Sequence, residues 1–477
     1  MTEIRIPTEI IQLFTPEEAW EYNLLPYGKE GAALCCYGNA GRDYTLQETE
    51  LEVVFGLPVQ VTLLPADELH RLLHRYYRKE EGTENGRSVR VMNVDSPDYI
   101  RGLIEEGYRN NASDIHFEPY EHRCRVRFRI DGSLIERYIV EKGNYPALVN
   151  RLKIMANLDI SEKRLPQDGR ILYRVGDRPF DLRVSSLPTI YGEKVVLRLL
   201  TRRLELLELE NLGFDDKQLE DYTRAIRRPN GLVLISGPTG SGKSTTLYAT
   251  LRLLNKERSN ILTIEDPVEY TLEGVNQVQL KEEIGLTFGS ALRTFLRQDP
   301  DIIMLGEIRD ADTAQMAVRS SLTGHLLLST IHTNSAWGSV ARMTDMGIHP
   351  YLLADTLVLC VAQRLVRILC PHCKQPAERD THLKSLLGAG HSEGAYYRAA
   401  GCERCYYTGY SGRKAVYEVI PVDHYLAEQV RRSGNEVDAR LKQQGIRTLK
   451  DSMISLYRSG ETSLEELAPL LGGENSQ

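Results

Sequence analysis

The chain has 477 residues, enough for about three domains at roughly 150 residues each. Its net charge is -7, and acidic and basic residues are interspersed, so it lacks the one-sided basic face of a nucleic-acid-binding protein. The start is too charged for a signal peptide, and the longest apolar stretch, 351–365, is interrupted by Asp355 and Gln363. We therefore expect no nucleic acid as main partner and no direct membrane insertion. Two CxxC pairs and otherwise scattered cysteines favour a reducing, cytoplasmic compartment.

The first 204 residues predict two domains joined by a linker. Residues 1–77 alternate short amphipathic pieces with turns and end in a helical pattern, whereas the charged residues 78–89 have no apolar period. Residues 90–204 contain half-exposed strands such as CRVRFRID, where basic and apolar residues alternate. Between 121 and 203, eighteen Lys and Arg stand against ten Asp and Glu, so this second domain is expected to face something anionic.

From about residue 205, apolar runs alternate with helical patterns. The runs GLVLIS, NILTIED, DIIMLGEI and HLLLSTIH are typical of parallel strands buried on both faces, so residues 205–365 are predicted to form an α/β core. Residues 366–415 contain the cysteine pairs, and residues 416–477 are predicted to be helical up to a polar end.

The sharpest motif is GPTGSGKS, a complete GxxxxGK[ST] between a strand-like run and a helical pattern. In this context, backbone N–H groups and the helix N-terminus bind phosphates, Lys243 reaches the β- and γ-phosphates, and Ser244 binds Mg²⁺. The chain is therefore predicted to bind a nucleoside triphosphate. The predicted loop comprises Gly237, Pro238, Thr239, Gly240, Ser241, Gly242, Lys243, Ser244 and Thr245.

Carboxylates at the ends of two strands are candidates for hydrolysis, which needs a residue to position or activate water near the γ-phosphate. Glu265, Asp266 and Glu269 follow one strand, and Glu307 and Asp310 follow another. A surface or capping role is the alternative for any single one of them. Glu307 is the strongest candidate because it follows an apolar run that would be buried.

The cysteine pairs have the spacing C-x₂-C-x₂₈-C-x₂-C. Four thiolates in two knuckles provide a closed tetrahedral set, which favours structural Zn²⁺ because no position stays open for catalysis. Four thiols without metal are the alternative. The predicted ligands are Cys370, Cys373, Cys402 and Cys405, with His372 and His391 expected to be bystanders.

Several segments resemble, in chain order, a known family. GPTGSGKSTT, TIEDPVEY, LRQDPDIIMLGEIRD and TGHLLLSTIHTN are similar to the Walker A, Asp box, Walker B and His box of the type II/IV secretion ATPase superfamily, and ASDIHFEP, RLPQDGRI and YGEKVVLRLL also resemble it. The likeness is greatest to its assembly ATPases. It implies an α/β multidomain fold with a RecA-like P-loop ATPase core. A mixed α/β (PAS-like) domain and a small N-terminal domain would precede that core, and a zinc-binding tetracysteine insert and a helical C-terminus would follow it.

The resemblance also implies a function. It predicts a cytoplasmic homohexamer that hydrolyses Mg-ATP to power pseudopilus assembly and protein export in a type II secretion system. The N-terminal domain would dock on inner-membrane platform proteins, so the chain would be peripheral at that membrane. Assembly of a type IV pilus or of a DNA-uptake pilus is the alternative. Three further alternatives are a retraction ATPase, disfavoured by the cysteines and the long N-terminal region, a RecA-like nucleic-acid translocase, disfavoured by the charge, and a non-hydrolysing scaffold, disfavoured by Glu307.

By the same resemblance, Glu307 is the catalytic base, and the Asp box helps to position Mg²⁺ and water. An arginine from elsewhere usually reaches the γ-phosphate in such hexamers. The candidates are Arg127, Arg129, Arg183, Arg198, Arg293, Arg297 and Arg309, of which Arg183, Arg198 and Arg297 are predicted to bind nucleotide. Ser335 stands where the family often has an acidic residue.

Two histidines flank the strand-like run LLLSTI. Seven residues apart, His325 and His332 would lie about 23 Å apart and on opposite faces of a straight strand, so they cannot share one phosphate. Ligands of parallel sheets lie at the carboxyl ends of strands. His332 is therefore predicted to sense the γ-phosphate, and His325 to fix the preceding turn or a subunit contact.

Overall fold

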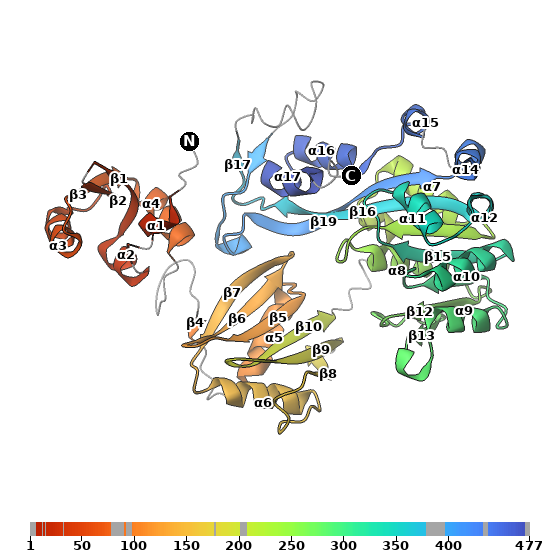
Figure 1. The fold of residues 1–477 in the computed structure, drawn as a ribbon, viewed down its shortest axis with the longest axis horizontal. Helices are drawn as coiled ribbons and strands as arrows, with labels where there is room; N and C mark the ends of the chain where they lie inside the picture. Colours follow the sequence, from red (N-terminus) through yellow and green to blue (C-terminus); the bar gives the residue numbers. More distant parts are fainter. Residues whose placement is uncertain are drawn as a thin grey trace. The chain divides into compact units, whose positions relative to one another are not determined.

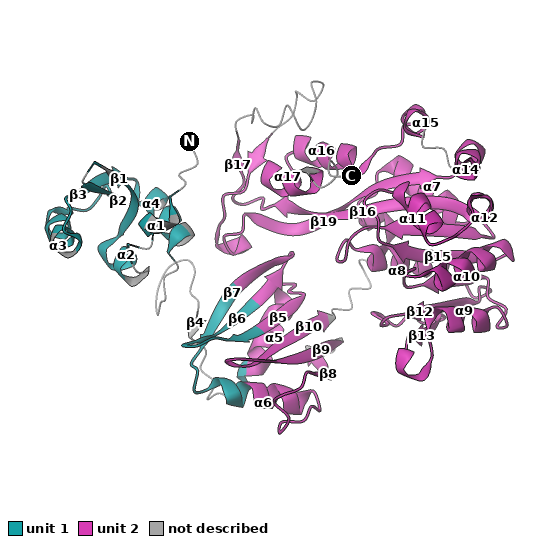
Figure 2. Cartoon of the chain, in the orientation of Figure 1, with its two compact units in different colours: residues 1–99, 117–127, 136–148 teal, residues 100–116, 128–135, 149–477 magenta. Residues whose placement is uncertain are grey.

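A computed structural model describes residues 6–11, 13–14, 16–31, 33–77, 90–91, 98–175, 178–200, 208–377, 396–432 and 437–472. Contacts divide the chain into two units, one of residues 1–99, 117–127 and 136–148 and one of residues 100–116, 128–135 and 149–477 (Figure 2). The predicted linker, 78–89, lies outside the described residues. The six-part division expected from sequence stays a prediction.

The N-terminal part of the first unit is a three-stranded sheet with four helices (Figure 1). The strands are β1 (Leu24–Glu30), β2 (Ala33–Asn39) and β3 (Val59–Leu64), and the helices are α1 (Thr8–Ile11), α2 (Pro16–Tyr22), α3 (Thr45–Phe55) and α4 (Ala66–Tyr76). Strand β2 pairs antiparallel with β1 and parallel with β3. Leu25 and Leu34 from the strands and Leu69 and Leu73 from α4 share one buried cluster, so this segment has its own apolar core.

The second sheet has seven strands in the order β4-β7-β6-β5-β10-β9-β8. Its elements are β4 (Arg90–Val91), α5 (Tyr99–Arg109), β5 (Asp114–Pro119), β6 (Cys124–Ile130), β7 (Ser133–Val140), α6 (Tyr145–Met155), β8 (Gln167–Val175), β9 (Arg178–Thr189) and β10 (Gly192–Leu200). Along β6, apolar residues are buried and the arginines between them are half-exposed. The alternation expected from CRVRFRID is therefore confirmed.

The third sheet carries the P-loop and has the order β13-β12-β14-β15-β11-β16-β19. Its strands are β11 (Gly231–Ser236), β12 (Ile261–Glu265), β13 (Asn276–Gln279), β14 (Ile302–Leu305), β15 (Leu326–Ile331), β16 (Leu357–Leu369) and β19 (Tyr410–Pro421). All neighbours pair in parallel except β16 and β19. Leu232 and Leu234 join one buried cluster, whereas Val233 and Ile235 join another. Because alternate residues of β11 enter different clusters, the sheet is buried on both faces, as predicted.

The helices of the core lie before or between these strands and pack on the sheet (Figure 1). They are α7 (Asp216–Ile226), α8 (Lys243–Leu254), α9 (Phe288–Phe295), α10 (Ala311–Leu322), α11 (Gly338–Asp345) and α12 (Pro350–Thr356), with short 3-10 turns η2 (Leu209–Asn211) and η3 (Glu282–Ile284). Such connections between parallel strands place ligand sites at the carboxyl ends of the strands.

The C-terminal part holds the cysteine pairs and, in its described residues, four helices. A two-stranded sheet, β17 (Gln375–Pro376) and β18 (Tyr397–Arg398), is followed by the turn η4 (Glu403–Cys405). The helices are α14 (His424–Arg431), α15 (Asp438–Gln443), α16 (Leu449–Arg458) and α17 (Leu464–Gly472), which confirms the predicted helical C-terminus. Within the described residues, no helix is both long and apolar enough to cross a membrane.

Candidate active site and metal centre

The strand register brings four segments to one level of the third sheet. Ser236 of β11 pairs with Ile331 of β15, Ser329 of β15 pairs with Leu305 of β14, and Leu305 pairs with Ile264 of β12. Residues just past these strand ends therefore lie side by side. They are the P-loop after β11, the Asp box after β12, the Walker B segment after β14 and the His box after β15.

The P-loop depends on glycine at positions where a side chain would not fit. Gly237 and Gly242 have φ of 150° and 89°, in the region that favours glycine. A Cβ on Gly237 would lie 2.5 Å from the carbonyl of Gln363, and one on Gly242 would lie 2.8 Å from the Gln363 amide. The Ser241 hydroxyl is buried and has no hydrogen-bond partner among the described residues. A buried hydroxyl without a partner inside a glycine cradle fits a phosphate oxygen.

Lys243 begins α8 and points back into this cradle. Its Nζ donates to the carbonyls of Gly237 (2.7 Å) and Pro238 (3.0 Å). Burial is the main cause that lowers the pKa of Lys243 to about 8, with Glu307 opposing the shift and Arg364 adding to it. A polyphosphate would replace the carbonyls as partner of the ammonium group and stabilise its charged form.

Glu307 is the centre of the carboxylate cluster. Its Oε2 lies 3.3 Å from Nε2 of His332, and its other oxygen forms an ion pair with Arg309. Arg309 also lies 3.6 Å from Asp266, so Walker B, the His box and the Asp box meet here. Asp310 instead caps α10, where its carboxylate accepts the N–H of Thr313 at 2.8 Å. Of the alternatives for Asp310, the structure supports the capping role.

His325 lies at the opposite end of β15 from His332. Its Nδ1 is 2.9 Å from the carbonyl of Ser320 and 3.1 Å from the hydroxyl of Thr323. These contacts tie the end of α10 to the start of β15. Of the two roles predicted for His325, fixing the preceding turn or a subunit contact, these contacts support the first.

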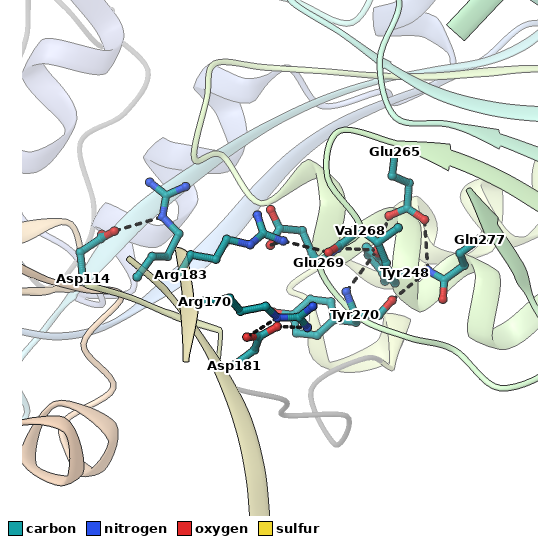
Figure 3. Close-up of polar contacts among 11 residues, drawn as sticks. Asp114, Arg170, Asp181, Arg183, Tyr248, Glu265, Val268, Glu269, Tyr270 and Gln277 are labelled. Carbon is teal, nitrogen blue, oxygen red and sulfur yellow. Dashed lines mark hydrogen bonds and ion pairs between the residues drawn. The ribbon is translucent and has the colours of Figure 1, made fainter. Parts of the chain in front are cut away.

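The three acidic residues of the Asp box differ in exposure. Asp266 is 41% exposed, whereas Glu265 is buried. Glu265 accepts hydrogen bonds from Tyr248 and Gln277 (Figure 3) and a further one from Thr263. Burial raises the pKa of Glu269 above its ordinary value, and Arg183 and Arg198 oppose that shift. Asp266 and Glu269, at 41% and 31% exposed, are therefore more accessible to a ligand than Glu265.

Three arginines lie in one row across the second sheet. Arg170 of β8 and Arg198 of β10 are both directly opposite Arg183 of β9. Like charges in such positions repel one another, and each arginine has an anionic partner. Arg198 lies 3.1 Å from Asp114. Arg170 pairs with Asp181, and Arg183 donates to the carbonyl of Val268 (2.9 Å) and lies 3.8 Å from Glu269 (Figure 3). Arg183 thus contacts the Asp box of its own chain.

The other candidate arginines have different surroundings. Arg297, in the turn just after α9, donates to the backbone carbonyl of Arg293 in that helix, and Arg293 itself pairs with Asp312 at 2.8 Å. Arg127 makes two bonds of 2.8 Å to Glu118, and Arg129 donates to the carbonyl of Gly132. Their roles at a nucleotide stay predictions.

Two residues of β16, missed from sequence, contact the helix after the P-loop and the His box. The carbonyl oxygen of the Gln363 side chain accepts the hydroxyl of Thr246 at 2.9 Å, and Arg364 donates to the carbonyl of Asn334 at 3.2 Å. Their signal in the sequence is a polar pair interrupting an apolar strand. That signal does not predict which residues the pair contacts, because the pairing of β16 with β11 joins segments far apart in the sequence.

The four predicted cysteine ligands converge. All four Sγ atoms lie within 4.8 Å of one another, with 3.9 Å from Cys370 to Cys402 and 3.7 Å from Cys373 to Cys405. A tetrahedral ion with bonds of about 2.3 Å separates its sulfur ligands by about 3.8 Å. The cluster therefore fits a metal ion. His372 lies 3.0 Å from Arg404 and is outside the cluster, and His391 is outside the described residues.

The fold and the P-loop define a RecA-like P-loop ATPase core within a mixed α/β chain. The chain belongs to the type II/IV secretion system protein family, whose model matches residues 96–469. The type II secretion system ATPase E of Vibrio cholerae is 46% identical over 373 residues, which are 77% of this chain and 74% of the relative. The type IV pilus assembly ATPase PilB of Myxococcus xanthus is 41% identical over 502 aligned positions, covering 98% of this chain and 87% of the relative.

Solved structures of similar fold include an ATPase and a pilus retraction motor. The Legionella pneumophila ATPase DotB has a TM-score of 0.60 at 20% identity, covering 81% of this chain and 99% of DotB. The pilus retraction motor PilT with bound ADP has a TM-score of 0.54 at 25% identity, covering 78% of this chain and 96% of PilT. The likeness to DotB concerns the fold alone.

The titration of Lys243 predicts how nucleotide affinity depends on pH. Bound phosphate favours the charged form of Lys243, so above about pH 8 the complex holds more protons than the free protein. The affinity for nucleotide therefore falls as the pH rises and free Lys243 loses its proton. Calorimetry with Mg-ATP should show that the dissociation constant rises above this pH, by up to about tenfold for each pH unit. Lys243→Arg keeps its charge throughout, so whatever affinity it retains should not change with pH. A constant wild-type affinity from about pH 7 to about pH 9.5 would contradict this account.

The two histidines should respond differently to replacement by alanine. His332→Ala should lower ATP hydrolysis by about 10²-fold, the typical loss of one donor to developing charge, while ADP binding persists. His325→Ala should instead lower the unfolding temperature and leave turnover per folded protein unchanged, because its contacts are structural. Thermal melts and steady-state kinetics on both variants decide. A stable but inactive His325→Ala protein would reverse the assignment.

Proposed function

We propose that this chain is a homohexameric ATPase that hydrolyses Mg-ATP to power pseudopilus assembly and protein export in a type II secretion system. The observation that carries the proposal is the meeting of Lys243, Glu307, Asp266 and His332 at one end of the parallel sheet. Membership of the secretion family and the names of the relatives support the coupling to export.

The residues divide the work of hydrolysis between them. Backbone N–H groups of the P-loop, the Ser241 hydroxyl and Lys243 would bind the phosphates, and Ser244 would hold Mg²⁺. When bound, the metal ion neutralises charge that develops on the β- and γ-phosphate oxygens. Glu307 would take the proton from the attacking water, and His332 beside it would donate to the γ-phosphate.

The arginines and the remaining Asp-box residues complete the proposed site. Arg183 and Arg198 come from the basic second domain and already face Glu269. We assign them to the phosphates of bound nucleotide, in competition with their present carboxylate partners. Asp266 and Glu269 would orient the water molecules around Mg²⁺, since carboxylate oxygens suit that ion.

Type IV pilus assembly is the second candidate, and one observation favours it. The alignment to PilB of Myxococcus xanthus spans 98% of this chain, including the N-terminal segment, whereas that to the Vibrio cholerae relative spans 77%. The type II relative from Dickeya dadantii, at 42% identity, reaches 88%. Both machines would draw on the same ATP chemistry and differ in the docking partner.

The N-terminal segment supplies the proposed attachment. Residues 1–77 have a buried cluster of their own around the three-stranded sheet, as expected of a docking module. We assign this segment to inner-membrane platform proteins of the secretion or pilus machine. The chain would then be cytoplasmic and peripheral at the inner membrane through that partner.

Zinc is the proposed metal of the cysteine cluster. Four thiolates at tetrahedral spacing match the ligand preference of Zn²⁺ and leave no open coordination position. The ion would join the segment after β16 to the segment before β19, two strands that pair directly. Its role would therefore be structural.

Replacing Glu307 tests the hydrolysis proposal. Glu307→Gln keeps the size and hydrogen bonding of the side chain but removes the base, so turnover should fall by about 10²- to 10⁴-fold while Mg-ATP binding stays nearly intact. Lys243→Ala should instead weaken binding itself. Nucleotide affinity and steady-state hydrolysis are measured on both. A Glu307→Gln protein that retains more than about a tenth of the wild-type rate would rule out the general-base role.

Metal analysis tests the zinc proposal. The purified chain should hold about one zinc per molecule, and Cys402→Ser should release it and destabilise residues 366–415 while ATP binding persists. Cys124→Ser is the matched control, because Cys124 is buried in β6 outside the cluster and should leave the zinc in place. Wild-type protein without metal would defeat the assignment.

A further inference from the structure

We infer that Tyr248 is a positioning residue for ATP hydrolysis, which fixes the Asp-box loop, residues 266–270, against the helix that carries Lys243 and Ser244. This inference rests on the proposed hydrolysis of Mg-ATP at the P-loop. It concerns a side chain that would touch neither nucleotide nor metal and would act through Asp266 and Glu269.

The hydroxyl of Tyr248 meets three groups of the Asp box at once. Tyr248 lies in α8, is 1% exposed, and donates its hydroxyl to Oε2 of Glu265 (Figure 3). The hydroxyl oxygen of Tyr248 itself accepts the backbone N–H groups of Glu269 (3.1 Å) and Tyr270 (3.3 Å). One phenol thus binds Glu265, the last residue of β12, and also Glu269 and Tyr270 at the far end of the loop that follows.

The ring of Tyr248 is held as firmly as its hydroxyl. It packs edge-on against the ring of Tyr270, with centroids 5.1 Å apart. Burial and the neighbouring Glu265 raise the pKa of Tyr248 well above its ordinary value, so the hydroxyl stays protonated and able to donate. Ring and hydroxyl therefore fix the loop by packing and by hydrogen bonds together.

Glu265 and Gln277 extend this network to both ends of the loop. Oε1 of Glu265 accepts the hydroxyl of Thr263 (2.6 Å) and the amide of Gln277 (3.1 Å). Gln277 also donates to the carbonyl of Tyr270 and accepts the N–H of Leu272, both at 2.8 Å. With these donors, the buried carboxylate of Glu265 serves as an anchor for the loop, which leaves Asp266 and Glu269 to face the site.

The far side of the same loop is bound by the second domain. Arg183 donates to the carbonyl of Val268, the residue just before Glu269. The loop thus lies between Tyr248 on one side and Arg183 on the other. Because Tyr248 is five residues from Lys243 on one rigid helix, it links the position of the Asp-box carboxylates to that of the P-loop. A displacement of about 1 Å at a reacting centre can cost about 10²-fold in rate.

Removing the hydroxyl should therefore impair turnover more than binding. In Tyr248→Phe, Glu265 loses a donor and two backbone N–H groups lose their acceptor inside the protein, an unfavourable state that the loop relieves by moving. The P-loop does not use this hydroxyl. We expect kcat to fall by about 10- to 100-fold, the affinity for Mg-ATP to change by less than about threefold, and the Mg²⁺ concentration for half-maximal rate to rise.

Tyr222→Phe is a matched control for the loss of a buried hydroxyl. Tyr222 is 0% exposed, and its hydroxyl lies 2.6 Å from that of Thr250 on the same helix α8, away from the Asp box. The variant loses a hydrogen bond of similar burial, so its stability should fall while kcat and the Mg²⁺ dependence stay near wild type. Gln277→Met, which removes a second support of the loop, should reproduce the kinetic signature of Tyr248→Phe.

The experiment compares full-length wild type, Tyr248→Phe, Tyr222→Phe and Gln277→Met by steady-state ATPase kinetics, Mg²⁺ titration and thermal melts. A kcat loss in Tyr248→Phe and Gln277→Met but not in Tyr222→Phe supports the inference. Equal kcat in Tyr248→Phe and Tyr222→Phe overturns it. If Tyr248→Phe does not fold, an unchanged kcat in Gln277→Met overturns it. A wild-type chain that hydrolyses no Mg-ATP would contradict the proposed function. An active wild type whose kcat is unchanged in Tyr248→Phe and Gln277→Met would contradict this inference alone.

Discussion

The carboxyl ends of β11, β15, β14 and β12 lie at one level of a parallel sheet, and every segment of the candidate site depends on that register. Ser236 is level with Ile331, and Leu305 with Ser329 and Ile264. The P-loop, His332, Glu307 and Asp266 therefore meet without any loop crossing the sheet. A slip of one residue would turn every side chain of a strand to the other face and separate the cluster.

Charge balance is the second feature that the segments share. Lys243 is buried near Glu307, Arg309 bridges Glu307 and Asp266, and Arg183 faces Glu269. Each cation thus has a carboxylate or carbonyl partner, which avoids the high cost of an unpaired buried charge. Bound polyphosphate would compete for the cations and release the carboxylates toward metal and water. Nucleotide binding would then loosen the contact of Arg183 with the Asp box, which lies on the second domain's side of the site.

The strands, the P-loop and the cysteine cluster could be predicted because their signals are local. Four apolar runs are typical of buried parallel strands, and the spacing of the CxxC pairs predicts that the four thiols lie together. The sequence could not show that Asp310 caps a helix while Glu307, three residues earlier, faces the site, because strand ends do not reveal side-chain direction. Nor could it find Tyr248 or Gln363. Their partners lie 17 and 117 residues away, and only tertiary packing brings them together.

Hydrogen–deuterium exchange with and without Mg-ATP tests most directly whether these four segments form one site. The Glu307→Gln chain serves as the sample, so that nucleotide is not consumed. The account predicts that residues 237–245, 265–270, 306–310 and 331–334 gain protection together, over the same range of nucleotide concentration. Protection confined to the P-loop, or protection of the four segments at different concentrations, would contradict it.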